Sequence, residues 1–208
     1  IDDVWGQARP LTVLVREALG GGAPTEVILR ALHTSDSLYV LAEWPDATRS
    51  DMRDPYIWNE SDGGYQRPTT PDDQFALEFP LDGELLISML PTTGAYSADV
   101  WHWKAQRTNP MGYADDQLLT DIVKENHETT GRVSDKKSAG SYSNNFDKKL
   151  GRPMLTARSG VAGPVLAKKD AVQFTGGAKE GMVLPREVLA RPQGSRGDID
   201  AGGVWKKG

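Results

Sequence analysis

Residues 74–79, Gln-Phe-Ala-Leu-Glu-Phe, decide the fold class of this chain. Their large apolar side chains recur at every second position, which places Phe75, Leu77 and Phe79 on one face of an extended strand. Residues 80–83, Pro-Leu-Asp-Gly, then have the composition of a turn, and residues 84–89 return as another apolar segment. This pattern predicts neighbouring antiparallel strands.

Strand-sized segments also lie before this stretch. Residues 11–15 are apolar and rich in β-branched side chains. Residues 26–32 and 37–44 are separated by His33-Thr-Ser-Asp36, which has the composition of a turn. We therefore predict a hairpin over residues 26–44.

A further strand is predicted over residues 99–105, Asp-Val-Trp-His-Trp-Lys-Ala. Alternation puts Trp101 and Trp103 on one face and His102 on the other, where it either faces solvent or lines a site. Strands at short intervals with turns between them predict an all-β fold, an antiparallel β-sandwich with long loops and one or two short helices.

Residues 107–173 differ from the rest, because periodic apolar residues are scarce and Gly, Ser and Asn are frequent. We expect a long, largely irregular excursion, of the kind that is often functional. Within it, residues 115–126 could form one short helix, with Asp115 or Asp116 as its cap.

The composition narrows the function classes. The 208 residues predict a single domain over residues 1–208. Cysteine is absent, which excludes disulfides, thiolate metal sites and covalently attached haem. The net charge is −5 with both signs interspersed, which argues against nucleic acid as a partner. No run of eighteen apolar residues exists, so no membrane span is predicted.

The residue types and their spacing do not by themselves identify a metal or catalytic site. His33, His102 and His127 do not share metal-ligand spacing, and adjacent carboxylates such as Asp115 and Asp116 point opposite ways in an extended chain. His102 could ligate haem or a metal, or could simply be a polar residue in a strand.

Two methionines and a lysine pair are further candidates. Met89, before Pro91, and Met111 are either gap-filling residues or thioether ligands to haem iron. Lys168 and Lys169 would usually be solvated, and an amine can bind a metal only after losing its proton.

Seven segments, in this order, resemble the haem-binding domain of the ethylbenzene dehydrogenase and dimethylsulfide dehydrogenase type. They are residues 3–13, 27–33, 38–46, 72–80, 99–105, 112–116 and 194–200. The resemblance implies a β-sandwich, immunoglobulin-like or carbohydrate-binding-module-like, that holds one haem b and transfers electrons without substrate chemistry of its own. Because it has no cysteine, the chain resembles the branch of the family that binds b-type haem.

In the family's best-known setting such a domain is the γ subunit of a periplasmic molybdenum oxidoreductase. The resemblance thus implies an iron–sulfur (β) subunit and a molybdopterin (α) subunit as partners, or a soluble cytochrome acceptor. It also implies a periplasmic or otherwise exported protein. Family members continue with further strands where this chain ends, so the C-terminal strands of the pattern are expected to be missing.

The family's haem has a Met and a Lys as axial ligands. Met89 matches the first position, and Lys169 or its neighbour Lys168 matches the second. Trp101 and Trp103 then become packing residues beside the haem pocket, with His102 a neighbour of a haem propionate. Met111 and His102 remain alternative iron ligands.

Two other functions stay open. The sandwich could be a haem-free module that presents its tryptophans to a carbohydrate or a protein partner. A weaker hypothesis is a metal enzyme that uses His102 with Asp115 and Asp116.

Overall fold

The computed structural model describes residues 2–16, 23–83, 96–120, 131–134, 142–161, 165–189 and 199–206. Within these ranges the regular structure is almost entirely β-strand, and the helical segments are short 3₁₀ helices of at most five residues. The predicted all-β, sandwich-like fold class is confirmed. None of the helices in the described ranges has the length and apolarity that crossing a membrane would require.

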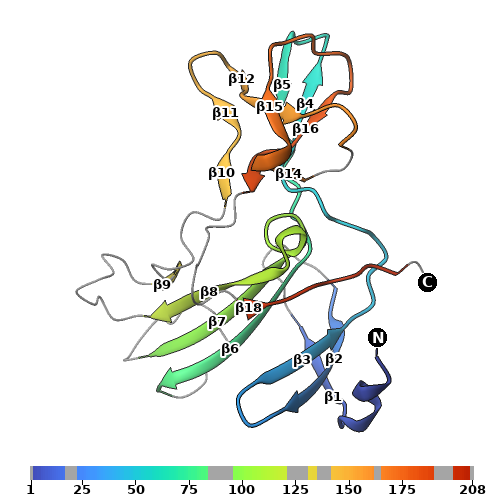
Figure 1. The fold of residues 1–208 in the computed structure, drawn as a ribbon, viewed down its shortest axis with the longest axis vertical. Helices are drawn as coiled ribbons and strands as arrows, with labels where there is room; N and C mark the ends of the chain where they lie inside the picture. Colours follow the sequence, from blue (N-terminus) through green and yellow to red (C-terminus); the bar gives the residue numbers. More distant parts are fainter. Residues whose placement is uncertain are drawn as a thin grey trace. The chain divides into compact units, whose positions relative to one another are not determined.

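The contacts divide the chain into two compact units, Ile1–Arg49 and Ser50–Gly208. The first is a three-stranded antiparallel sheet of order β1-β2-β3 (Figure 1). Its elements are η1 (Asp3–Gln7), β1 (Leu11–Val15), β2 (Thr25–His33) and β3 (Leu38–Glu43).

The predicted hairpin is confirmed as β2 and β3. Its turn is closed by the side chain of Thr34, which donates to Asp36 Oδ1 over 2.8 Å and accepts a bond from the Ser37 amide over 3.2 Å. The Thr34 amide also donates to the Ser37 carbonyl. Hydroxyl and carboxylate side chains thus supply the bonds that the turn backbone lacks.

The second unit contains the sheet that carries residues 74–79 and 99–105. Its strands are β6 (Gln74–Asp82), β7 (Ser97–Lys104), β8 (Tyr113–Thr120), β9 (Gly131–Ser134) and β18 (Ile199–Asp200). The order is β18-β8-β7-β6, and β9 also pairs with β8. Alternation holds along β7, where every second side chain is buried.

One face of this sheet has a buried apolar cluster. Ala98 and Val100 of β7 pack with Leu119 of β8 and with Tyr96, and Ala76 of β6 lies against them. The other face carries the tryptophans. Every second side chain along β7 therefore lies on the same face of the sheet, as the alternation in the sequence predicts.

The helix predicted over residues 115–126 is wrong where the structure describes it, because Tyr113–Thr120 form strand β8. The remaining positions, 121–126, lie outside the described residues. In the predicted helix Leu118 and Leu119 would lie on one face. In the strand they point to opposite faces of the sheet. Pairing with β7 on one side and with β9 and β18 on the other outweighs the local pattern.

The other strands of the second unit form small sheets. These are β4 (Tyr56–Asn59), β5 (Gly64–Gln66) and β16 (Val183–Leu184); β10 (Tyr142–Asn144), β14 (Leu166–Ala167) and β17 (Glu187–Leu189); β11 (Phe146–Asp147) and β12 (Arg152–Pro153); β13 (Leu155–Ala157) and β15 (Ala171–Gln173). The region expected to be largely irregular, residues 107–173, thus contains β8 to β15, most of them two to four residues long.

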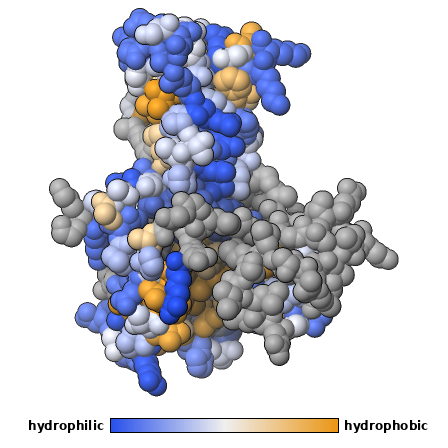
Figure 2. Space-filling view, turned by 180° about the vertical axis from the view of Figure 1, so that it is seen from behind, coloured by the Kyte–Doolittle hydropathy of each residue, from blue (hydrophilic) through white to orange (hydrophobic). Residues whose placement is uncertain are grey.

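Two features hold these small sheets together. Tyr56 stacks on Phe146 with ring centroids 4.8 Å apart, beside buried Phe174. Asn145 is fully buried: its amide donates to the carbonyls of Leu155 and Pro185 over 2.9 Å each, and its oxygen accepts from the Leu155 amide. A single buried amide therefore satisfies three backbone groups. Over the face drawn in Figure 2 the described surface is mostly hydrophilic, with apolar residues in separate patches.

Candidate functional site

The side chains of Phe75, Leu77, Phe79, Trp101 and Trp103 share one face of the β6–β7 pair, which we call the aromatic face. Phe75 lies opposite Trp103 and Leu77 lies opposite Trp101. The rings of Phe79 and Trp101 have centroids 4.7 Å apart. All five side chains are half-buried. The prediction that the two tryptophans share one face of a strand is confirmed.

Both indole groups have their polar atom satisfied. Trp101 Nε1 donates to Asp99 Oδ2 over 3.0 Å, and Trp103 Nε1 donates to Asn109 Oδ1 over 3.1 Å. Each tryptophan is therefore fixed in its orientation by a hydrogen bond as well as by ring contacts.

The C-terminal segment Ile199–Lys206, which we call the C-terminal arm, lies against this face. Ile199 and Asp200 pair with β8, and the amide of Gly203 donates to Asn109 Oδ1 over 2.6 Å while Asn109 Nδ2 donates to the Gly203 carbonyl over 3.1 Å. A Cβ added at Gly203 would lie 2.8 Å from Cε2 of Trp103 and closer still to Cζ2. Glycine is needed here because the backbone touches the ring.

His102 lies on the opposite face of β7 and is buried, with 3% of its surface exposed. Its Nε2 is 2.8 Å from Gln74 Oε1, and its Nδ1 is 3.1 Å from Gln117 Oε1. Because Gln74 turns its own amide nitrogen toward Asp72, its oxygen accepts the proton of His102 Nε2. Of the two positions expected for His102, facing solvent or lining a site, the first is wrong, because the side chain is buried. Both ring nitrogens are engaged, so a role as metal ligand is not supported.

Next to it, Lys104 forms a buried ion pair with Asp115. Lys104 and Asp115 are only 2% and 3% exposed. The ammonium also lies 3.4 Å from the hydroxyl of Tyr142 and 5.7 Å from the centre of its ring. Burial raises the pKa of Tyr142, and the carboxylate of Asp115 raises it further. The raised pKa keeps the Tyr142 hydroxyl protonated at neutral pH.

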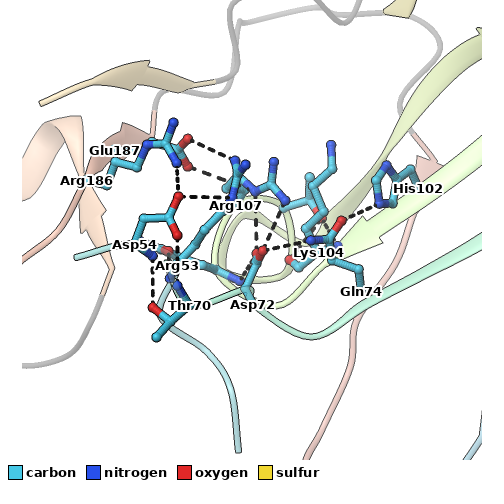
Figure 3. A network of polar contacts seen from close by, with 12 residues as sticks. Arg53, Asp54, Thr70, Asp72, Gln74, His102, Lys104, Arg107, Arg186 and Glu187 are labelled. Carbon is cyan, nitrogen blue, oxygen red and sulfur yellow. Dashed lines mark hydrogen bonds and ion pairs between the residues drawn. The ribbon is translucent and has the colours of Figure 1, made fainter. Parts of the chain in front are cut away.

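The contacts of His102 and Lys104 belong to a larger group of hydrogen bonds and ion pairs, which we call the polar network. It continues from Gln74 to Asp72 and beyond (Figure 3). Asp72 accepts hydrogen bonds from Gln74 and from Arg107, whose Nη2 is 3.0 Å from Asp72 Oδ1. Arg107 Nε also lies 4.0 Å from Glu187, which in turn lies 3.7 Å from Arg53. These contacts connect the β6–β8 sheet to β17 within the second unit.

Asp54 forms the far end of the network. It pairs with Arg186 and lies 3.9 Å from Arg53, and its backbone has a φ of 40°, which is rare for a residue other than glycine. Its amide donates to Thr70 O and its Oδ1 accepts from the Thr70 amide, both over 3.0 Å. Reciprocal bonds to Thr70 therefore hold the strained backbone in place.

The network is balanced in charge. Its cations are Arg53, Lys104, Arg107 and Arg186, and its anions are Asp54, Asp72, Asp115 and Glu187. Burial raises the pKa of Glu187, and the three arginines around it offset this only in part. Because its charged side chains are paired with one another and connect separate sheets, we interpret the polar network as structural.

The described ranges contain no group of three or more His, Asp or Glu side chains able to hold a metal ion. The carboxylate of Asp115 is paired with the ammonium of Lys104, and Asp116 lies opposite Trp101 in the sheet register. A metal site built from His102, Asp115 and Asp116 is therefore not supported.

The predicted iron ligands are not brought together in the described part of the chain. Met89 lies outside the described residues. Lys168 and Lys169 form the 3₁₀ helix η3 (Lys168–Asp170) between β14 and β15, in sheets other than that of β7, and both are exposed. Met111 is half-buried in η2 (Asn109–Met111), the turn that carries Asn109.

The second unit also has an open cavity of about 300 Å³. Its lining residues are Asp147, Leu150, Arg152, Pro153, Met154, Leu155, Gln173 and Phe174. None of the predicted site residues lines it, so it adds nothing to the haem hypothesis.

Sequence reasoning missed most of the polar network. Asp72, Lys104 and Arg107 flank or interrupt apolar strands, and a charged residue at an inward position of a strand is the signal that could have identified them. Asn109 and Gly203 are 94 residues apart and carry no such signal.

Comparison with known proteins identifies a family. The family model described as ethylbenzene dehydrogenase matches residues 2–208. No curated protein and no solved structure matches this sequence significantly. The match covers essentially the whole chain, including both tryptophans, the polar network and the C-terminal arm. The chain therefore belongs to the ethylbenzene dehydrogenase family and is a relative of a subunit of that oxidoreductase.

Proposed function

We propose that this chain is an electron-transfer protein that binds one non-covalent b-type haem. It acts as the γ subunit of an exported molybdenum oxidoreductase, or as a carrier for one. Electrons would arrive from the molybdopterin subunit through the iron–sulfur subunit, or leave to a soluble cytochrome.

The observation that carries the proposal is the family match over residues 2–208 in a chain without cysteine. A haem held by such a chain needs non-covalent contacts and axial ligands other than thiolate. The family match supports an oxidoreductase-related subunit, and the absence of cysteine selects the b-type cofactor within it.

The described residues are compatible with this cofactor. A porphyrin needs an apolar wall, and the aromatic face offers Phe75, Leu77, Phe79 and Trp101, which are half-buried, beside Trp103, against which the backbone of Gly203 already lies. In the described ranges no hydrogen bond or ion pair engages the exposed ammonium groups of Lys168 and Lys169, whereas that of Lys104 is committed to Asp115. Two lysines thus remain available as the amine ligand.

In this proposal Met89 and either Lys169 or Lys168 hold the iron. A bound haem would supply reversible one-electron chemistry. A thioether and a neutral amine add no charge to the iron, so they favour the reduced state. The lysine must lose its proton to ligate, either because binding removes it from water or because the iron itself displaces the proton. The polar network at the end of β7 is balanced in charge, so it adds no net charge near that strand.

The alternative of a carbohydrate module receives less support. A sugar ring stacks on an open aromatic face, but the backbone of Gly203 lies against Trp103 and both indole nitrogens are already bonded.

The test is reconstitution of the chain with haem, followed by optical spectroscopy. We expect a six-coordinate, low-spin b-type spectrum. Met89→Ala should give a five-coordinate or misligated iron, whereas Met154→Ala, on the rim of the separate cavity, should leave the spectrum unchanged. Parallel spectra of Lys168→Ala and Lys169→Ala identify the lysine ligand. A chain that stays colourless with added haem would contradict the proposal.

A further inference from the structure

The open cavity of the second unit is lined by two strand pairs, β11–β12 and β13–β15, and by the residues next to them. Met154 joins the two pairs, because its amide donates to the Asn145 carbonyl over 3.3 Å and its carbonyl accepts from the Phe174 amide over 2.8 Å. The buried side chain of Asn145 bonds to both backbone groups of Leu155. The walls of the cavity are therefore fixed by the fold of these strands.

Two opposite charges line this cavity. Asp147 and Arg152 are opposite each other in the register of β11 and β12, and facing residues of an antiparallel pair project to the same side of the sheet. The amides of Lys149 and Leu150 donate to Asp147 Oδ1 over 2.8 Å and 3.2 Å, which fixes the carboxylate. In the described ranges no hydrogen bond or ion pair engages its Oδ2 or the guanidinium of Arg152. One half-buried anion and one half-buried cation thus keep bonding capacity inside the cavity.

The charges and the remaining lining restrict the ligand. Most of the other lining side chains are apolar: Leu150, Pro153, Met154, Leu155 and Phe174. A purely apolar ligand would take water from both charges without replacing it, which costs free energy. A simple carboxylate would lie beside Asp147 and a simple amine beside Arg152, so each would meet a like charge. A zwitterion with an apolar side chain satisfies both groups, and a volume of about 300 Å³ suits a small ligand.

From the two fixed charges and the apolar lining we infer that this cavity binds a free apolar α-amino acid. Its carboxylate accepts charge-assisted hydrogen bonds from Arg152, and its ammonium donates to Oδ2 of Asp147. Its side chain lies against Met154, Leu155 and Phe174. Neither haem nor its axial ligands take part, so this inference and the proposed function can fail separately.

The experiment uses residues 1–208 with ¹³C in the methionine methyl groups, because Met154 lines the cavity and Met111 does not. The variant Met154→Leu identifies the signal of Met154. Titrations with L-phenylalanine, 3-phenylpropionate and 2-phenylethylammonium compare a zwitterion, an anion and a cation that share one phenyl group. We expect the Met154 signal to shift and that of Met111 to stay. L-phenylalanine should bind at least about fivefold tighter than either of the other two.

Substitutions of the two charges should change this selectivity in different ways. Arg152→Gln should remove the preference for L-phenylalanine over 2-phenylethylammonium. Asp147→Asn keeps an oxygen for the turn amides and should remove the preference over 3-phenylpropionate. Arg158→Gln is the control, since Arg158 pairs with Asp170 and does not line the cavity, and it should keep both preferences. Each result is a ratio of affinities within one protein, so partial unfolding of a variant does not imitate it.

Three results would overturn the inference: a Met154 signal that none of the probes shifts, equal affinities for the three probes, or affinity ratios that Asp147→Asn and Arg152→Gln leave unchanged. Tighter binding of 3-phenylpropionate than of L-phenylalanine would overturn it in favour of a site for simple carboxylates.

Discussion

Gly203 lies directly against the indole ring of Trp103, and the side chain of Asn109 bonds to both residues. This contact joins the C-terminal arm to the central strand of the sheet. It depends on the absence of a side chain at one position, which gives the first prediction.

Gly203→Ala should lower the free energy of unfolding by about 1–3 kcal/mol, because the new methyl group overlaps the ring of Trp103. Gly202→Ala is the matched control, since nothing lies within 4 Å of a Cβ at that position. Urea unfolding monitored by tryptophan fluorescence measures both. Equal stability of the two variants would show that the arm does not hold this position.

Lys104→Met should destabilise the protein by about 3–5 kcal/mol, because it leaves the carboxylate of Asp115 buried without a counter-charge. Adding Asp115→Leu should recover most of the loss, since the pair is then replaced by apolar groups. Glu43→Gln breaks a more exposed pair and should cost less than about 1 kcal/mol. Thermal unfolding of the four proteins provides the comparison, and failure of the double variant to recover would argue against a purely electrostatic cause.

Glu187 should make stability depend on pH in the direction opposite to most carboxylates. Its pKa is raised above the ordinary value of 4.5 in the folded chain, so the folded state binds the proton more tightly than the unfolded state does. The stability from protonated Glu187 is fully present below pH 4.5 and is lost as the pH rises through the raised pKa. Glu187→Gln should remove this part of the slope, whereas Glu60→Gln, at an exposed position, should keep it. Denaturant unfolding at a series of pH values tests the difference.

Asn145→Asp should be strongly destabilising, by about 3 kcal/mol, because a carboxylate cannot donate to the carbonyls of Leu155 and Pro185 and would be buried with its charge. Asn59→Asp is the control. The structure uses Asn59 as an acceptor for the amide of Asp62, a role that a carboxylate retains. Differential scanning calorimetry should therefore separate the two substitutions, and similar melting temperatures would contradict the role of Asn145.

Much of the strand content could be predicted from the sequence. Phe75, Leu77 and Phe79 alternate cleanly, and the turn at Thr34 uses side chains that close turns locally. In both cases the information lies within a few neighbouring residues.

The strand at residues 113–120 could not be predicted in this way. Its backbone is satisfied by β7, β9 and β18, and the strand carries Asp115, whose burial makes sense only because it forms an ion pair with Lys104 of the neighbouring strand. Local periodicity contains no information about a partner on another strand.

The candidate site was predicted in part. The sequence placed both tryptophans on one face, but it could not show that His102 is enclosed by Gln74 and Gln117, because these residues meet only through the sheet register. The assignment of Met89 and Lys169 or Lys168 to haem iron remains a prediction, which the spectra of the variants will decide.

The contact between Gly203 and Asn109 also sets an order of events during synthesis. The two residues are 94 positions apart, so Trp103 cannot acquire its native covering until the chain has been made through residue 203. Contacts of such long range form late and slow the final step of folding. Residue 203 must therefore be present before Trp103 can make all the contacts that it has in the folded chain.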